Sequence, residues 1–240
     1  MLILALDTTA KAASVAVTDG ERLLAQYNID NGLTQSELIL PMAENILKSL
    51  HLSFSDIELF AVSSGPGSFT GVRIGTAVVK GLAFGSSTPC VCISTLEELA
   101  ENLAGLDGIL VPVMDARRGQ VYNALFRSGK NGITRLTDDR AIAIEYLARE
   151  LSAFSGEKIY LSGDGYETAR EMLLSLGVPL EFTPPLLISE NAYSVARVAL
   201  RKYKAGEYTN DIGTLPTYLR VPQAERERLE RLAAERNEEK

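Results

Sequence analysis

An aspartate followed by two threonines, Asp7-Thr8-Thr9, ends the first apolar segment of the chain. A carboxylate and two hydroxyls at the carboxyl edge of a sheet are suited to holding a phosphate through a magnesium ion. The same residue types also cap backbone N–H groups in ordinary turns, and the spacing alone favours this simpler interpretation slightly. The three residues are therefore a candidate nucleotide site with a structural alternative.

A glycine-rich segment, GPGSFTGVRIG at residues 65–75, joins an expected strand to an expected helix. Glycine lets a backbone approach a ligand closely, and a helix N-terminus attracts anions. The segment lacks the Gly-Lys-Ser/Thr ending of a P-loop, and Thr70 stands where a dinucleotide-binding loop has its third glycine. It is a general anion-binding candidate, although glycines serve tight helix packing equally well.

Two further turns carry residues of chemical interest. Gly163-Asp164-Gly165 follows an expected strand and opens an expected helix, where a two-lobed nucleotide fold contacts a nucleobase or ribose. Asp115-Ala116-Arg117-Arg118 offers a carboxylate and two guanidinium groups, which suit phosphate and RNA backbone. An ordinary αL turn and a solvated turn explain these two motifs more simply.

The scarcity of histidine and cysteine excludes several classes of catalyst. The chain has one histidine and two cysteines. A Ser/His/Asp or Cys/His mechanism would have to use His51, and a histidine-rich metal site is impossible. His51 ends a helical pattern, where a cation suits the helix dipole. Cys90 and Cys92 fit a buried strand better than a disulfide framework or a zinc site.

The composition predicts a folded protein with no membrane segment. Apolar residues make up 46% of the chain, enough for a core. No apolar run approaches the roughly 20 residues that span a bilayer, and the start lacks the basic region of a signal peptide. We therefore expect a cytoplasmic protein. The net charge of −7 argues against a surface that binds nucleic acid throughout.

The elements that must position these residues alternate between strands and helices. In the first half, the patterns predict strands at 2–6, 14–17, 23–29, 59–63 and 90–93, and helices at about 36–50, 70–84 and 96–103. Thr34 or Ser36 can cap the first helix, with Glu37 as the capping-box partner of Thr34, while Pro41 argues against an unbroken first turn. In the second half, strands are expected at 108–114, 121–126 and 158–162, and helices at 144–151, 168–176 and 192–203.

The two halves of the chain share one pattern. Residues 3–17 can be aligned with residues 111–125, which places Asp7 on Asp115. Each half has an apolar strand, an aspartate, a polar turn and a second strand, followed by helices and further strands. This predicts two α/β units facing each other across a cleft. The expected domains are lobes at 1–106 and 107–222, with a charged helical or disordered tail at 223–240.

The helix expected at 70–84 is apolar on nearly all sides. Gly71 and Gly75 lie four residues apart on one face, and Val72, Val78 and Leu82 cover much of the remainder. Such a helix must be buried on nearly all sides. In a chain of this size, a second chain covers one of those sides most readily.

Taken together, five motifs resemble one family. LALDTT, GPGSFTGVRIG, STLEELA, DARRGQVY and LPTYLR, which span Met1 to about Arg220, are similar to the TsaB (YeaZ) family. The resemblance implies the duplicated, two-lobed α/β fold of actin-like, sugar-kinase and Hsp70-like ATPases (ASKHA). It also implies a part in making threonylcarbamoyladenosine (t6A) in tRNA. In that family the chain is the non-catalytic partner of TsaD, which transfers the threonylcarbamoyl group and works with the ATPase TsaE.

The resemblance implies that catalytic and metal-binding residues are absent. Residues 93–100 are similar to the stretch of TsaD that carries two metal-binding histidines, and the match puts Thr95 and Leu99 at those positions. Threonine is a poor iron or zinc ligand, and leucine is none. No cofactor is implied beyond weak binding of ATP or ADP and Mg²⁺ at or near the partner interface. The residues of this vestigial nucleotide cleft are Asp7, Thr8, Thr9, Gly163 and Asp164.

The function that the resemblance implies is docking to TsaD. The helices at about 36–50 and 70–84 resemble the elements that pair with TsaD in a four-helix contact. The residues expected at this interface are Ile39, Met42, Ile46, Gly71, Ile74, Gly75 and Val78. Without TsaD, a second copy of the chain would cover the same face as a homodimer, so the two assemblies compete. Contact with tRNA is expected only through the complex.

The alternative function is an actin-like ATPase or phosphotransferase that uses Asp7, Thr8 and Asp164 around Mg-ATP, and it predicts tight nucleotide binding by the isolated chain. A peptidase is disfavoured because the sequence has no Ser/His pair and no metal cluster. An independent tRNA-binding protein is disfavoured by the net charge of −7 and by the lack of a basic run beyond Arg117-Arg118.

Overall fold

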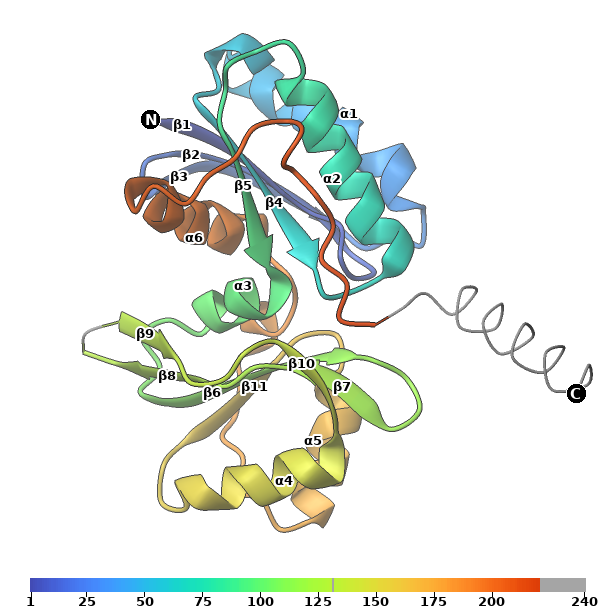
Figure 1. Ribbon diagram of the computed structural model, residues 1–240, viewed down its shortest axis with the longest axis vertical. Coiled ribbons are helices and arrows are strands. Elements are labelled where there is room, and N and C mark those ends of the chain that lie inside the picture. Colours follow the sequence, from blue (N-terminus) through green and yellow to red (C-terminus); the bar gives the residue numbers. More distant parts are fainter. Residues whose placement is uncertain (131, 221–240) are drawn as a thin grey trace, which may run out of the picture.

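A computed structural model of the chain describes residues 1–130 and 132–220, and Figure 1 shows two lobes, one above the other. The sheet of the first lobe has the strand order β3-β2-β1-β4-β5. The sheet of the second lobe has the order β10-β7-β6-β8-β9, with β11 also paired to β6. The predicted α/β class with two lobes is confirmed, whereas the tail at 223–240 lies outside the described residues.

The first lobe is an α/β/α sandwich. Its strands are β1 (Leu2–Asp7), β2 (Ala13–Asp19), β3 (Arg22–Ile29), β4 (Leu59–Gly65) and β5 (Cys90–Ser94). Helices α1 (Gln35–Ser49) and α2 (Phe69–Ala83) cover one face, and α6 (Ala192–Lys204) covers the other. Alternation along β1 explains the two layers, since Leu4 and Leu6 pack toward α1 while Ile3 packs toward α6.

Local signals in the first lobe agree with the structure. Gly20 closes the β2–β3 hairpin in the left-handed region, with φ of 59°. The backbone N–H of Thr34 donates to the carboxylate of Glu37 in the predicted capping box at the start of α1. Pro41 lies inside α1, which continues through it to Ser49, so the expected interruption is not seen.

The second lobe repeats the central pairing of the first. In both sheets the strand that ends in the aligned aspartate has an antiparallel neighbour and a parallel neighbour: β1 has β2 and β4, and β6 has β7 and β11. The elements are β6 (Gly108–Asp115), β7 (Gln120–Asn123), β8 (Phe126–Gly129), β9 (Gly132–Arg135), β10 (Arg140–Ala143), α4 (Ile144–Leu151), β11 (Ile159–Ser162) and α5 (Tyr166–Ser175). Short 3₁₀ turns occur at Phe54–Asp56, Ser152–Phe154 and Pro185–Leu187.

One predicted strand, at residues 121–126, is two strands in the structure. β7 pairs with the end of β6, whereas β8 pairs with its beginning. Pro112, between those two regions of β6, has no N–H group with which to continue the ladder. The side chain of Asn123 donates to the Pro112 carbonyl at 2.9 Å and so ends β7 at this point. The short strands β9 and β10 were not predicted.

The predicted boundary between the lobes needs a correction, because each lobe contributes a helix to the layer between the sheets. Helix α3 (Thr95–Asn102), assigned to the first lobe, packs on the second sheet through Leu96 and Leu99. Helix α6, assigned to the second, packs on the first sheet through Val195 and Ala199. The chain therefore returns to the first lobe before residue 192.

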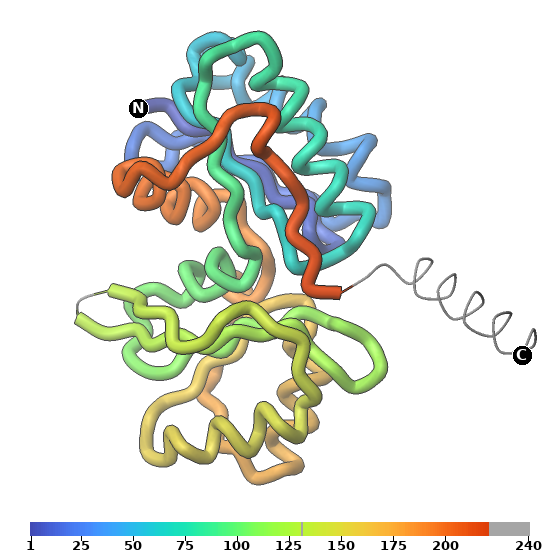
Figure 2. Tube along the Cα trace, in the orientation of Figure 1, coloured from blue at the N-terminus to red at the C-terminus, as the bar shows by residue number. Residues whose placement is uncertain are grey.

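After α6 the chain runs back along the first lobe, and we call residues 205–220 the strap. Figure 2 shows it passing along α2 and ending near the junction of the lobes. Thr209 forms a bridge to Cys90 on the edge strand β5, and the Thr217 N–H donates to the Ser64 carbonyl at 2.7 Å. A side chain at Gly65 would place its Cβ 2.4 Å from the Thr217 carbonyl oxygen, so glycine there allows the strap to lie close.

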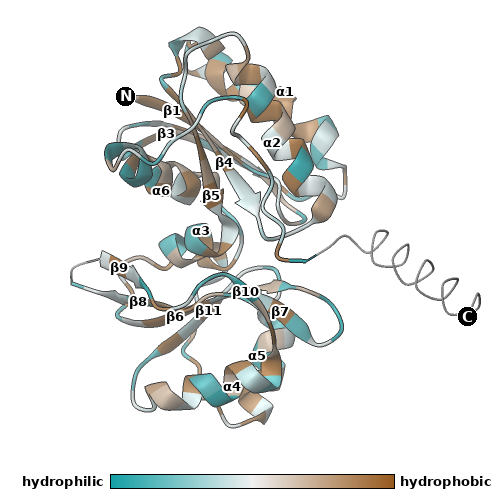
Figure 3. Cartoon of the chain, viewed as in Figure 1, coloured by the Kyte–Doolittle hydropathy of each residue, from teal (hydrophilic) through white to brown (hydrophobic). Residues whose placement is uncertain are grey.

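Apolar residues follow the strands of both sheets, as Figure 3 shows for β1 and β5. Within the part of the chain that the structure describes, no helix combines the length and the apolar character needed to cross a bilayer.

Candidate functional site

The residues of the first chemical motif lie at the end of β1 and are fully buried. Asp7, Thr8 and Thr9 each have an exposed fraction of 0%. One carboxylate oxygen of Asp7 accepts a hydrogen bond from the Thr9 N–H at 3.0 Å, and the other accepts one from the Thr9 hydroxyl at 2.9 Å. Each oxygen of the Asp7 carboxylate thus accepts one hydrogen bond from its own turn.

The glycine-rich segment packs directly against these residues. The Thr8 hydroxyl donates to the Gly71 carbonyl at 2.7 Å, and the Ser68 N–H donates to the Thr9 carbonyl at 2.7 Å. A Cβ on Gly71 would lie 1.9 Å from the Thr8 carbonyl oxygen, and one on Gly67 would lie 2.5 Å from that of Thr9. The glycines therefore serve close packing, and the chain itself fills the space beside the motif.

A buried glutamate, Glu98 on α3, adds a second carboxyl group beside Asp7. One oxygen of Glu98 accepts the Asn191 N–H at 2.6 Å, and the other accepts the Ser63 hydroxyl. Burial, and then the charge of Asp7, raise the pKa of Glu98 well above its usual range. Burial also raises the pKa of Asp7, against hydrogen bonds from Thr9 and Glu98 that lower it. Burial therefore favours the protonated form of both carboxyl groups relative to a carboxyl group in water.

Two more carboxyl groups face this pair from the gap between the lobes. Burial, followed by the charges of Asp7 and Asp164, raises the pKa of Glu190 to about 8. Burial also raises the pKa of Asp164, whose carboxylate accepts the Asp115 N–H at 2.9 Å. The charge of Asp7 also acts on Asp164, so the two predicted carboxyl groups lie near one another. Glu98 and Glu190 were missed by the sequence analysis, and the only signal for Glu98 was its place in STLEELA.

The second candidate turn is also shaped by packing. Gly163 has φ of 104°, and a Cβ there would lie 2.2 Å from the Val113 carbonyl oxygen of β6. Its N–H donates to the Ile188 carbonyl at 2.6 Å. Gly163 therefore holds α5 against the second sheet.

Neither position that matches a metal-binding histidine of TsaD holds a good metal ligand here: one is Thr95 and the other is Leu99. Thr95 and Leu99 are both fully buried, and Leu99 belongs to the core between α3 and the second sheet. The Thr95 hydroxyl has no hydrogen-bond partner among the described residues. Across residues 1–130 and 132–220, no group of three or more His, Cys, Asp or Glu side chains is placed to hold a metal ion.

The remaining candidates for reactive chemistry lie apart from this gap or inside the core. His51 follows the end of α1 with φ of 55° and is exposed, as a helix-terminal residue. Cys90 and Cys92 lie on β5, and burial raises the pKa of both thiols. Buried thiols with raised pKa values are poor nucleophiles.

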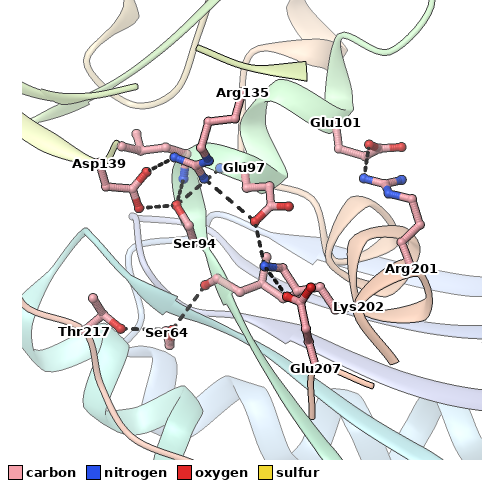
Figure 4. A network of polar contacts seen from close by, with 12 residues as sticks. Ser64, Ser94, Glu97, Glu101, Arg135, Asp139, Arg201, Lys202, Glu207 and Thr217 are labelled. Atoms are coloured by element: carbon pink, nitrogen blue, oxygen red, sulfur yellow. Dashed lines mark hydrogen bonds and ion pairs between the residues drawn. The ribbon is translucent and has the colours of Figure 1, made fainter. Parts of the chain in front are cut away.

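Charged side chains tie α3 to both lobes, as Figure 4 shows. Glu97 on α3 pairs with Arg135 of the second lobe at 3.8 Å and with Lys202 of α6 at 3.2 Å. Glu101, only 3% exposed, pairs with Arg201 at 2.6 Å and with Arg197 at 3.0 Å. Exposed pairs contribute little individually, but the buried Glu101 carboxylate depends on its two arginines. The network therefore links α3 to α6 through the buried Glu101 and to the second lobe through the weaker pair of Glu97 and Arg135.

The structure places most of the predicted interface residues inside the first lobe. Five of them are buried: the side chains of Ile39, Met42 and Ile46 lie in the core of the lobe, and the backbone of Gly71 and Gly75 packs against Thr8. Ile74 and Val78 on α2 are half-buried and keep part of their surface exposed. The surface that a partner can reach is therefore smaller than the sequence analysis expected.

The chain matches one protein-family model and is similar to proteins of known name. Residues 34–226 match the family described as TsaD: tRNA N6-adenosine threonylcarbamoyltransferase. The tRNA threonylcarbamoyladenosine biosynthesis protein TsaB of Escherichia coli K12 is 31% identical over 92% of this chain and 95% of its own length. The protein of the same name from Bacillus subtilis 168 is 37% identical over 55% of this chain and 58% of its own.

Solved structures agree on the fold. YeaZ from Pseudomonas aeruginosa superposes with a TM-score of 0.75 at 24% identity, over 91% of this chain and 99% of that one. Together with the two-sheet topology, this likeness confirms the two-lobed α/β fold that the resemblance predicted.

Proposed function

The chain belongs to the TsaB (YeaZ) family, and from this membership we propose that it is a non-catalytic docking subunit of the machinery that makes t6A in tRNA. It binds TsaD as a heterodimer, assembles with TsaE, and meets tRNA as part of that complex. Its place of action is the cytoplasm. Without TsaD, it pairs with a second copy of itself.

The observation that supports this proposal most directly is that Asp7, at the end of β1, is buried and inaccessible to a ligand. A magnesium-bound phosphate needs an accessible, ionised carboxylate. Asp7 is fully buried, is hydrogen-bonded to Thr9, and shares its site with Glu98. Gly71 of the glycine-rich segment lies directly on Thr8. These contacts support a structural role for Asp7, Thr8 and Thr9. We therefore place the expected weak nucleotide binding at a surface near the partner.

The docking surface we propose is a stripe of α2 made of Ile74, Ala77, Val78 and Gly81. These residues recur at i, i+3, i+4 and i+7, so they lie on one face of the helix. Ile74 and Val78 are half-buried, and Ala77 and Gly81 are exposed. A Cβ on Gly81 would meet nothing within 4 Å, so a partner helix can come close to the backbone. Such a stripe suits helix-to-helix packing with TsaD.

Because one surface serves both assemblies, the homodimer and the TsaD heterodimer exclude each other. The effect on TsaD follows from differential binding. A partner that contacts the active conformation of TsaD more favourably than other conformations shifts TsaD toward that state. Activation therefore needs no catalytic group on this chain.

Association with TsaD and t6A formation, measured on the same preparations, test the proposal. Val78→Arg and Gly81→Arg place a charge on the stripe, and Gly81 has free space around it, so that variant keeps its fold. Leu174→Arg on α5, where the side chain is 42% exposed, is the matched control. Both stripe variants should lose co-elution with TsaD and t6A formation, while the control keeps both. Full t6A formation by a stripe variant that no longer binds TsaD would overturn the proposal.

A further inference from the structure

Three motifs that are far apart in the sequence meet at the end of the strap. Arg73 of GPGSFTGVRIG donates through Nε to the Tyr218 hydroxyl at 2.9 Å, and Tyr218 belongs to LPTYLR. Arg220 of the same motif donates through Nη1 to the Ala116 carbonyl of DARRGQVY at 2.7 Å. The strap thus joins the start of α2 to the turn after β6.

Arg73 and Arg220 contact this meeting point, and Arg117 and Arg118 directly follow Ala116 there. We call these four residues the arginine patch. Arg73, Arg117 and Arg118 are exposed, and Arg220 is half-buried. Among residues 1–130 and 132–220, none of the four has a carboxylate within 4 Å as an ion-pair partner, whereas arginines such as Arg135 and Arg201 do. In a chain with net charge −7, this is an uncommon concentration of unpaired positive charge.

Aromatic rings accompany the arginines. The rings of Phe69 and Tyr218 stack with centroids 4.3 Å apart, and the Arg73 guanidinium lies 4.3 Å from the Phe69 centroid. Arg220 lies 5.7 Å from the centroid of Tyr122. Tyr218 keeps 41% of its surface exposed. Guanidinium groups beside the exposed ring of Tyr218 offer both phosphate contacts and a surface on which a base can stack.

The backbone of the turn displays two of these arginines at a conformational cost. Arg117 and Arg118 are consecutive residues in the left-handed region, with φ of 60° and 56°. Residues other than glycine seldom adopt this conformation. The Arg117 N–H donates to the Asp115 carboxylate at 2.7 Å, which fixes the turn.

Acidic groups also lie near the patch. Asp115 begins the same turn, and Asp164 accepts the Asp115 N–H. Lys11 faces Asp164 and partly offsets its charge. The Asp115 carboxylate accepts the Arg117 N–H and forms no ion pair with the four arginines, three of which are exposed.

We propose that the arginine patch is an RNA-binding surface, on which the guanidinium groups contact backbone phosphates and Tyr218 contacts a base. The identification of this RNA as tRNA rests on the proposed function. The patch adjoins the N-terminal end of α2, next to the docking stripe, so RNA on the patch lies beside the bound partner. The exposed ring of Tyr218 among the arginines favours RNA over an acidic lipid surface, which would need only the charge.

Fluorescence anisotropy of a labelled, unmodified tRNA transcript, titrated with the full chain at about 50 mM salt, tests the proposal. The patch variant is Arg117→Glu with Arg118→Glu. The control is Arg149→Glu with Arg170→Glu, which reverses the same charge at two exposed arginines on α4 and α5. We expect about tenfold weaker binding by the patch variant, with a salt slope lower by roughly 1 to 2, and at most about twofold weaker binding by the control. Tyr218→Phe should keep RNA binding, and Tyr218→Ala should weaken it.

Equal losses in the patch and control variants would overturn the proposal, as would absence of tRNA binding by the unaltered chain at this salt. Binding to phosphatidylglycerol vesicles without binding to tRNA would also overturn it. Co-elution with TsaD separates this result from the proposed function. A patch variant that binds TsaD but not tRNA supports both the docking function and the RNA-binding surface. If the unaltered chain binds tRNA through the patch but does not bind TsaD, only the RNA-binding surface is supported.

Discussion

The hydroxyl of Thr8 donates a 2.7 Å hydrogen bond to the carbonyl of Gly71, and a side chain at Gly71 would place its Cβ 1.9 Å from the Thr8 carbonyl oxygen. The end of β1 and the start of α2 are therefore in direct backbone contact. The space between a helix N-terminus and the carboxyl end of a strand is a favourable place for a phosphate in proteins generally. Here the chain fills that space with its own atoms.

Replacing Gly71 with alanine should therefore destabilise the protein. The added Cβ meets backbone that cannot move aside cheaply, and we expect a loss of about 3 kcal/mol in the free energy of unfolding. Gly81→Ala on the same helix is the matched control. Because nothing lies within 4 Å of its Cβ, it should gain roughly 0.5–1 kcal/mol from helix propensity. Urea unfolding followed by circular dichroism measures both, and a Gly71→Ala protein as stable as Gly81→Ala would refute the close contact.

The isolated chain should bind Mg-ATP weakly. The alternative ATPase or phosphotransferase needs an ionised and accessible Asp7 carboxylate. Asp7 is buried and hydrogen-bonded to Thr9, and burial raises the pKa of its carboxyl group. Isothermal titration calorimetry should give little heat, and Asp7→Asn should change that heat little. Tight binding that Asp7→Asn abolishes would favour the ATPase.

Stability should fall as the pH rises from about 5 to 8. Burial and the charges of Asp7 and Asp164 raise the pKa of Glu190 to about 8, so the native state binds this proton more tightly than the unfolded chain does. The stabilisation is fully present below the pKa that Glu190 has in the unfolded chain. It is lost as the pH rises from there toward 8, by up to about 1.4 kcal/mol per pH unit. The raised pKa values of Asp7 and Glu98 act in the same direction.

Glu190→Gln should flatten that dependence, because the amide cannot ionise. Urea unfolding at several pH values measures it, with Glu44→Gln, an exposed residue of α1, as the control. An identical pH dependence in the Glu190→Gln protein and the unaltered chain would show that Glu190 does not titrate in this window.

Local patterns in the sequence predicted most of the elements because each depends on neighbouring residues. The capping box of Thr34 and Glu37, the Gly20 turn and the alternation along β1 all act within a few positions. The break between β7 and β8 was missed because it depends on Pro112, which lies in a different strand. The packing of α3 and α6 across the lobes was missed because periodicity reveals an apolar face but not the sheet that covers it.

The sequence singled out Asp7 and Asp164 but not the groups that surround them. The charge of Asp7 acts on Asp164, so the two carboxyl groups lie near one another. The neighbours that decide their behaviour, Glu98 and Glu190, come from α3 and from the segment before α6. The arginine patch was missed for the same reason, since no single segment supplies more than two of its four guanidinium groups.

The most direct test of the central claim, that this chain docks on a catalytic partner and does not itself react, is the amount of t6A formed on an unmodified tRNA transcript, measured by nucleoside mass spectrometry. TsaD with TsaE should form little t6A, adding this chain should restore formation, and this chain alone should form none. Formation of t6A by this chain alone, or full formation by TsaD and TsaE without it, would contradict the account.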